Sequence, residues 1–284
     1  MAAEVPLQPV HERGWRMGLA NMLSKENGAW WRTRFWIVQS VIWLFILNGI
    51  VATLLWAAPE QPASPSGNGT GETSVVERLM AEKPNTGLFI FLLMSGIAPV
   101  VGTIIIGQDA LIAEKQSGTA AWVLSKPVSR TAFVLSKLVG HGLGLLVTAV
   151  LLQGLIAYLQ VSAAAGRALP PLPFLAALGV VFLNLLFYLT LTLMLGALFD
   201  NRGPVIGIPL ALLFGYQLFL GVAPWLAEIM PWALVVNAQP DSLPISVALA
   251  LEQPLPSITP VIGALLWSAL FVAVALWRFN REEF

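Results

Sequence analysis

The chain has 284 residues, of which 57% are hydrophobic and 11% are charged, and its formal net charge at pH 7 is zero. A soluble domain carries about 25% charged residues, so this composition indicates an integral membrane protein, with a single domain over residues 1–284. The neutral charge argues against a nucleic-acid partner, and the absence of cysteine excludes disulfides, thiol catalysis and cysteine metal sites.

Residues 12–34 are predicted to form an amphipathic interfacial helix on the membrane surface. Trp15, Leu19, Met22 and Leu23 recur at helical spacing, while the basic residues of the segment occupy other positions. An unstructured basic tail is the alternative. The start of the chain has no hydrophobic core typical of a signal peptide, so a cleaved signal is not expected.

Six apolar runs are long enough to be membrane spans. A helix needs about 20 apolar residues to cross the hydrocarbon layer. The runs that meet this length are residues 35–57, 86–107, 132–161, 172–198, 205–222 and 258–277. The sequence therefore predicts an all-α integral membrane protein.

A polar island, residues 108–137, separates the second and third spans. Its first part is predicted to continue the helix of the second span as far as Gln116. The dipeptide Ser117-Gly118 then breaks that helix, because glycine readily ends one.

A second short helix is expected to follow the break. Thr119 is expected to cap this helix, Pro127 stops it, and Ser129 caps the third span. Two short helices would then fold back across the membrane face within the loop of residues 108–131.

This loop also has the composition of a docking site. The apolar residues Trp122, Val123 and Leu124 lie between two helix breaks, ringed by charged residues: Glu114, Lys115, Lys126 and Arg130. Apolar anchors with a charged rim are typical of protein interfaces. An ordinary solvated loop is the alternative.

Glycines recur in the third span at Gly140, Gly142 and Gly144. The pattern superficially suggests a nucleotide loop, but it follows no strand and lies inside a membrane helix. We interpret Gly140 and Gly144 as a surface of small residues on which another helix packs. His141, between them, is interpreted as a polar residue near the interface rather than a ligand or base.

The segment 223–257 is neither a full span nor a polar loop. Prolines interrupt it and leave apolar pieces of about 10–14 residues, a length that suits interfacial or re-entrant helices. We expect these pieces to dip into the outer leaflet between the fifth and sixth spans.

Basic residues predict the orientation. Of the 15 lysines and arginines, all but Arg78, Lys83 and Arg167 fall on the same side when the spans are threaded in order. The positive-inside rule then places both termini and the polar island in the cytoplasm. We expect a multi-pass protein of the plasma (inner) membrane.

The predicted spans have no Asp, Glu or Arg in their central turns. Carriers driven by protons or sodium usually need such groups, so an energy source outside the membrane part is favoured. The strongly polar residues of the spans are expected to form hydrogen bonds between helices; they are Gln39, Asn48, Gln153, Asn184 and Gln217. No G-x-x-x-x-G-K-[ST] phosphate loop occurs, so the chain does not bind ATP in that manner.

The polar island carries a family resemblance. It reads E-x-x-S-G-T and then L-S-x-P-V-S-R before an apolar helix, with these residues at the motif positions: Glu114, Ser117, Gly118, Thr119, Leu124, Ser125, Pro127, Val128, Ser129, Arg130 and Lys137. This pattern resembles the cytoplasmic loop of type-2 ABC transporter permeases. The resemblance extends over nearly the whole chain, from the interfacial helix through six spans to the re-entrant pieces.

The resemblance implies the membrane-spanning permease subunit of an ABC exporter. It implies a homodimer, or a heterodimer of similar subunits, with two copies of a separate ATPase that binds ATP and Mg²⁺, and no cofactor in this chain. It also implies that the island forms coupling helices seated in the ATPase, with Glu114, Ser117, Gly118, Thr119, Trp122, Leu124, Pro127 and Arg130 as the coupling residues. A secondary carrier or channel and a membrane-embedded lipid-modifying enzyme remain as alternatives. The loop at residues 59–85 is too short for a folded outer domain.

Overall fold

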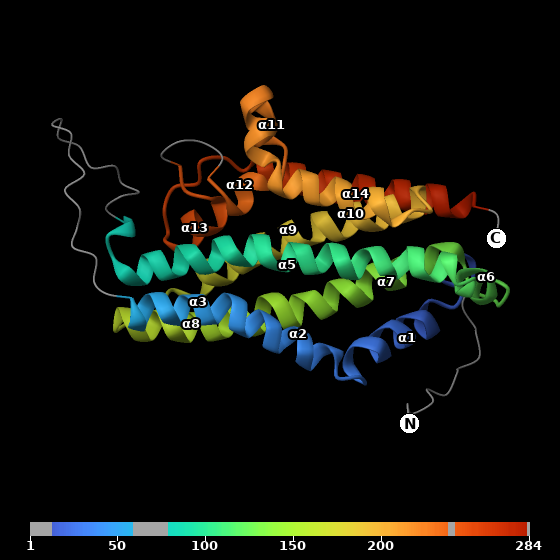
Figure 1. Ribbon diagram of the computed structural model, residues 1–284, viewed down its shortest axis with the longest axis horizontal. Coiled ribbons are helices and arrows are strands. Elements are labelled where there is room, and N and C mark those ends of the chain that lie inside the picture. Colours follow the sequence, from blue (N-terminus) through green and yellow to red (C-terminus); the bar gives the residue numbers. More distant parts are fainter. Residues whose placement is uncertain (1–12, 59–78, 238–241, 283–284) are drawn as a thin grey trace.

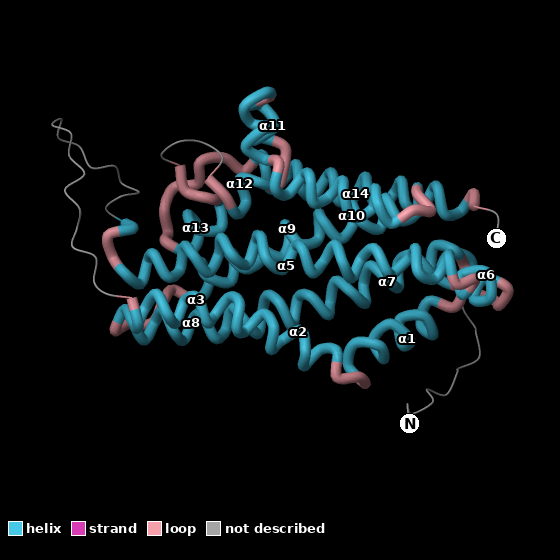
Figure 2. The backbone as a smooth tube through the Cα atoms, in the orientation of Figure 1, coloured by secondary structure: helices cyan, strands magenta, loops and turns pink. Residues whose placement is uncertain are grey.

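The computed structural model describes residues 13–58, 79–237 and 242–282. Within these ranges every regular element is a helix, and no strand occurs (Figure 2). The long helices lie side by side along the long axis of the molecule (Figure 1). The all-helical class predicted from the sequence is confirmed.

Five helices are long and apolar enough to cross a membrane, or six if one bent pair is counted as a single span. The first, Phe35–Ala57, comprises α2 (Phe35–Trp43), η2 (Leu44–Asn48), α3 (Gly49–Ala52) and η3 (Thr53–Ala57). The others are α5 (Lys83–Gln116); α7 (Arg130–Leu145) continued by η4 (Leu146–Leu151) and α8 (Leu152–Ala165); α9 (Pro171–Leu198); and α14 (Thr259–Asn280).

Helix α9 forms the centre of the bundle. It is the most buried of the candidate spans, and it packs chiefly against α14 and α5. The first span and α14 are the least buried. Side chains such as Phe187 and Tyr188 of α9 are almost inaccessible, so burial of apolar surface around this helix is the main source of cohesion within the chain.

Buried amides join neighbouring helices, as the sequence predicted for three of the polar residues in spans. Asn48 Nδ2 donates to Gln153 Oε1 at 2.9 Å, and Gln153 Nε2 donates to the Ser40 carbonyl at 3.0 Å. Asn184 Nδ2 donates to the Gly96 carbonyl at 2.8 Å. These bonds satisfy the NH2 groups of the three amides, whose burial would otherwise cost free energy.

The predicted fifth span, residues 205–222, is not a continuous helix. The structure divides it into α10 (Arg202–Phe214) and α11 (Tyr216–Val222), which meet at an angle of 67°. The bend lies at Gly215, where a Cβ atom would lie 2.4 Å from the Ala211 carbonyl oxygen. Only glycine fits that close approach, and α11 consequently projects sideways from the bundle (Figure 1).

Short helices follow the bend, as predicted for residues 223–257. They are η5 (Pro224–Glu228), α12 (Trp232–Val235) and α13 (Ile245–Ala250), and both α12 and α13 pack against α9. Their re-entry into the membrane stays a prediction. Parts of four predicted segments lie outside the described residues: residue 12 of the interfacial helix, 59–78 of the outer loop, 238–241 of this segment, and 283–284 at the C-terminus.

Candidate docking site at the charged end

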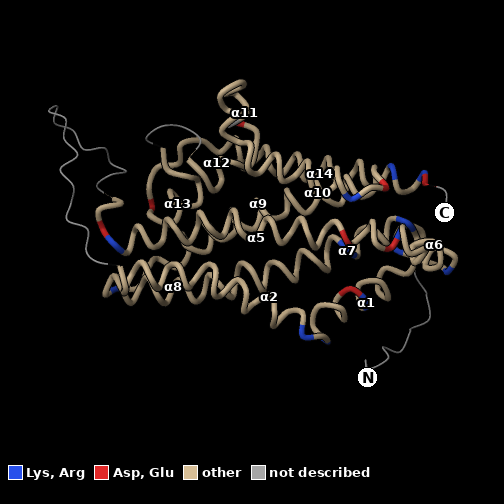
Figure 3. Tube along the Cα trace, in the orientation of Figure 1, with Lys and Arg blue, Asp and Glu red and all other residues tan. Residues whose placement is uncertain are grey.

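Charged residues gather at one end of the bundle, which we call the charged end (Figure 3). It comprises the 3₁₀ turn η1 (Gly14–Arg16), α1 (Leu19–Trp31), the last turns of α5, the short helix α6 (Thr119–Leu124), the start of α7 and the end of α14. Both ends of the described chain lie here (Figure 1). The polar island predicted as a docking site is therefore surrounded by segments distant in sequence.

The loop between α5 and α7 largely follows the prediction. Helix α5 ends at Gln116, and Gly118 takes a left-handed conformation with φ +71°. Ser117 and Gly118 are exposed between the two helices. Ser129 caps α7, its Oγ accepting a hydrogen bond from Ala132 N at 3.0 Å.

Two details of that prediction were wrong. Thr119 does not cap α6: the capping position is occupied by Gly118, and the Thr119 hydroxyl lies 2.8 Å from the Ser117 hydroxyl instead. Only α6 is a separate short helix, because residues 109–116 continue α5 without a break. The left-handed glycine both ends α5 and starts α6, since Trp122 N donates to the Gly118 carbonyl.

Helix α6 has one face buried and one exposed. Ala120 and Val123 belong to a buried apolar cluster beneath the loop, and Leu124 is half-buried against that cluster. Trp122 is 62% exposed, and the Lys126 ammonium lies 3.5 Å from its ring centroid. Of the three expected apolar anchors, Trp122 is the one that the fold leaves open to a partner.

Glu114 lies in an ion cluster rather than in an exposed rim. Its Oε1 is 2.8 Å from Lys25 Nζ of α1 and 2.9 Å from Lys137 Nζ of α7. Lys137 also lies 3.2 Å from the Glu26 carboxylate. Lys137 and Glu26 are buried. The cluster therefore ties the last turn of α5 to α1 and α7.

Sequence reasoning missed Lys25 and Lys137 as partners of Glu114, and it missed Glu26 as a further partner of both lysines. A signal for Glu26 was present, because it is spaced by four residues from both Met22 and Trp30, and all three lie on the buried face of α1. No local pattern indicated Lys137.

The small-residue surface on α7 is confirmed, and its partner is α1. A Cβ atom at Gly144 would lie 2.3 Å from the Trp30 ring, and one at Gly140 would lie 2.7 Å from Glu26 Cβ. Trp30 Nε1 donates to His141 Nδ1 at 3.0 Å. Of the predicted apolar face, Met22 is buried by protein, Leu19 and Leu23 are half-buried, and Trp15 is exposed. That the helix lies on the membrane surface stays a prediction.

The N-terminal turn holds the start of α7. Ser129 Oγ donates to the Trp15 carbonyl, and Ser129 N donates to the Met17 carbonyl at 2.9 Å. Gly18, with φ +77°, lies so close to Val128 and the Pro127 carbonyl that a side chain there would clash. Pro127 itself is exposed. Residues 15–18 therefore fix the turn between α6 and α7 through these contacts.

The end of α14 closes the other side of the loop. Arg130 donates to the carbonyls of Asn280 (2.8 Å) and Glu282. Its guanidinium therefore binds the residues at the end of α14 and is not part of a charged rim around Trp122. Lys115 Nζ pairs with the Glu282 carboxylate at 2.8 Å and with Asp200 at 2.7 Å. The hydrogen bond from Lys115 is the main reason that the pKa of Asp200 lies below its ordinary value.

Helix α6, with its exposed Trp122, thus lies beside three segments that contact one another or the loop: η1, α1 and the end of α14. Of the predicted site residues, Ser117, Gly118, Trp122 and Pro127 are exposed, and Thr119 and Leu124 are half-buried. Glu114 and Arg130 bind other parts of the chain.

Comparison with known proteins gave one family match. The family described as "ABC-2 family transporter protein" matches residues 20–284 of the chain. No curated protein matched. The matched range begins within α1 and includes the whole loop between α5 and α7.

Proposed function

The chain belongs to the ABC-2 family of transporter proteins, and from this premise we propose that it provides the substrate path of an ABC exporter whose ATPase is a separate subunit. The ATPase docks at the charged end, on the exposed face of α6. ATP and Mg²⁺ are bound by that partner. The permease chain receives the motion that ATP binding and hydrolysis produce.

The observation that carries this proposal is the exposure of Trp122 on a helix whose other face is packed against the bundle. Large aromatic residues are the usual energetic anchors of protein interfaces, and Trp122 is 62% exposed while its neighbours Ala120 and Val123 are buried. A force on α6 would reach α5 across the short turn at Ser117 and Gly118. Through Glu114 it would also reach α1 and α7.

The distribution of buried charge supports an external energy source. Among the described residues, the Asp, Glu, Lys and Arg residues that are buried are Glu26 and Lys137, and both lie in the ion cluster at the charged end. A carrier driven by an ion gradient would be expected to have ionisable groups deeper in its spans. The secondary-carrier alternative therefore has no comparable support.

Family membership and the charge pattern support further parts of the proposal. Two permease chains, identical or similar, work with two ATPase subunits. The charged end faces the cytoplasm, because it holds most of the basic residues. A path lined by apolar side chains suits an amphiphilic or hydrophobic substrate.

The test is co-purification of the chain, solubilised gently from its native membrane, with an ABC ATPase subunit. Replacement Trp122→Ala should weaken the association by about 30-fold, since loss of a central interface tryptophan costs about 2 kcal/mol or more. Trp225→Ala is the matched control, because Trp225 is also 62% exposed but lies in η5, away from the charged end.

Retention of the ATPase by the Trp122→Ala variant at the wild-type level would contradict docking on α6. If neither the wild type nor the control retains any ABC ATPase under gentle solubilisation, the proposed function itself is wrong. Membrane insertion of every variant is checked by its recovery in the membrane fraction.

A further inference from the structure

The elbow between α1 and α2, residues 31–36, has a fixed backbone. Thr33 Oγ1 donates to the Ala29 carbonyl at 2.7 Å and accepts a hydrogen bond from Phe35 N at 3.1 Å. Arg32 N donates to the Gly28 carbonyl at 3.1 Å, at the end of α1. One threonine thus links the end of one helix to the start of the next, and the side chains between them project from a defined position.

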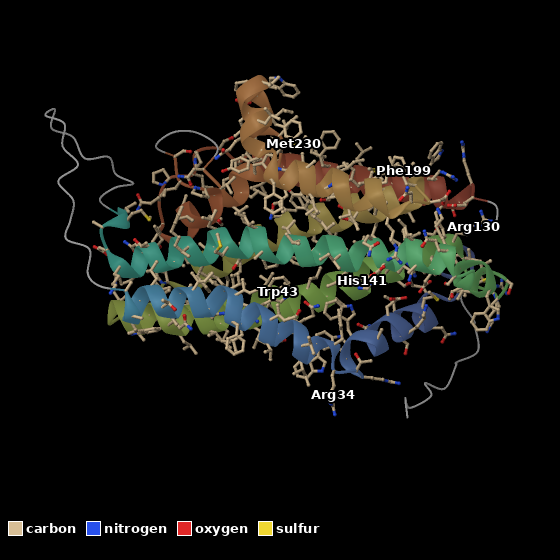
Figure 4. The ribbon with its side chains drawn as sticks, viewed as in Figure 1. Arg34, Trp43, Arg130, His141, Phe199 and Met230 are labelled. Carbon is tan, nitrogen blue, oxygen red and sulfur yellow. The ribbon has the colours of Figure 1, made fainter. Side chains whose placement is uncertain are left out.

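Two arginines project from this elbow without a carboxylate partner. Arg32 and Arg34 are exposed, and neither forms an ion pair with a carboxylate of the described residues. The stem of Arg32 lies along α1, with its Cδ 3.8 Å from where a Cβ of Gly28 would be. Arg34 points away from the bundle (Figure 4). Their positive charge is therefore available to a ligand.

Three aromatic residues are sequence neighbours of Arg32 and Arg34 in the elbow. Trp31, Phe35 and Trp36 are each exposed by slightly more than a third, and the centroids of the Trp31 and Trp36 rings are 6.3 Å apart. Phe35 is the first residue of the first candidate span. Tryptophan at the end of a span lies at the level of the lipid headgroups, so Arg32 and Arg34 lie at the depth of the lipid phosphates.

We propose that the elbow binds an anionic phospholipid, with Arg32 and Arg34 on the headgroup phosphate and the rings of Trp31, Phe35 and Trp36 against the lipid below it. Guanidinium groups form paired hydrogen bonds with phosphate oxygens. A zwitterionic headgroup brings its own cation and would leave much of this positive charge unmatched. A free phosphate ion would make no use of the three rings.

The bound lipid also stabilises the base of the docking site. Helix α1, which begins at the charged end and leads to the elbow, carries Lys25 and Glu26 of the ion cluster. A lipid that fixes the elbow therefore restricts the helix to which Glu114 is bound. This binding does not depend on the proposed ATPase partner.

The experiment uses the full chain, purified in a neutral detergent and stripped of lipid. It is then incubated with phosphatidylglycerol and phosphatidylcholine of the same acyl chains, and native mass spectrometry measures the lipid that stays bound. The wild type should retain more phosphatidylglycerol than phosphatidylcholine. The double replacement R32Q/R34Q should lower that preference by about 30-fold, since each of the two basic residues near an anionic headgroup contributes about 1 kcal/mol.

The control is R13Q/R16Q, which removes the same charge from the other end of α1, where Arg16 lies over the Trp15 ring. It should keep the wild-type preference. Equal retention of the two lipids by the wild type would overturn the proposal, as would an equal loss of preference in both double variants. Unchanged thermal unfolding of R32Q/R34Q shows that its loss of lipid does not come from misfolding.

Discussion

Glu114 is the residue at which three helices of the charged end meet. Its carboxylate lies within 2.9 Å of Lys25 and Lys137, and Glu26 completes a cluster with two positive and two negative groups. Removing one partner of a buried ion pair costs more than the pair contributes, because an uncompensated charge stays buried. Replacing a buried member of the cluster should therefore lower the free energy of unfolding more than replacing an exposed member.

Lys137→Met should destabilise the protein by about 3 kcal/mol, because it leaves two carboxylates with one lysine, Lys25, whose side chain is half exposed. Lys25→Met should cost less than about 1 kcal/mol, since solvent screens its charge. The side chains of these lysines are 2% and 46% exposed, respectively. Unfolding in detergent, followed as a function of denaturant, compares the two. Equal losses of stability in the two variants would show that burial does not determine how much each lysine contributes.

Local rules were enough to predict much of the loop between α5 and α7. The break at Ser117-Gly118 and the capping by Ser129 follow from the conformational preferences of glycine and serine, and both are confirmed. The pairing of Lys25 with Glu114 could not be predicted in that way, because 89 residues separate them. Such contacts arise only when helices pack.

At the scale of elements, the packing of α1 on α7 depends on two glycines. The sequence predicted a surface of small residues at Gly140 and Gly144, but it did not identify α1 as the helix that covers it. The predicted fifth span is present as a bent pair of helices, and the sequence did not reveal the bend. Hydropathy detects an apolar run, but it does not detect the close approach of Gly215 to the Ala211 carbonyl that bends the chain.

Gly144→Ala should loosen α1 from α7, because the added methyl group would lie 2.3 Å from the Trp30 ring. Overpacking of this kind typically costs about 1–3 kcal/mol. Gly142→Ala, on the same helix, is the control, since its methyl group would make ordinary contact with Leu186 at 3.7 Å. Hydrogen exchange over residues 19–31 should be faster in the first variant alone. Equal exchange in the two variants would mean that Trp30 moves aside without cost.

For the whole molecule, the central question is which side of the membrane the charged end faces. The chain has no cysteine, so a single introduced cysteine reports on one position. Ser125→Cys lies just after α6, and Arg167→Cys lies beyond α8 at the opposite end. In intact cells a membrane-impermeant maleimide should label the second and not the first. The reverse pattern would place α6 outside the cell, beyond the reach of a cytoplasmic ATPase.

The most direct test of docking is photo-crosslinking in membranes that contain the assembled transporter. A photoreactive amino acid replaces Trp122 in one variant and Trp225 in the other, two positions of equal exposure at different places in the bundle. We expect a crosslink from position 122 to the ABC ATPase subunit and none from position 225. A crosslinked ATPase at position 225, with none at position 122, would contradict the assignment of the charged end as the docking site.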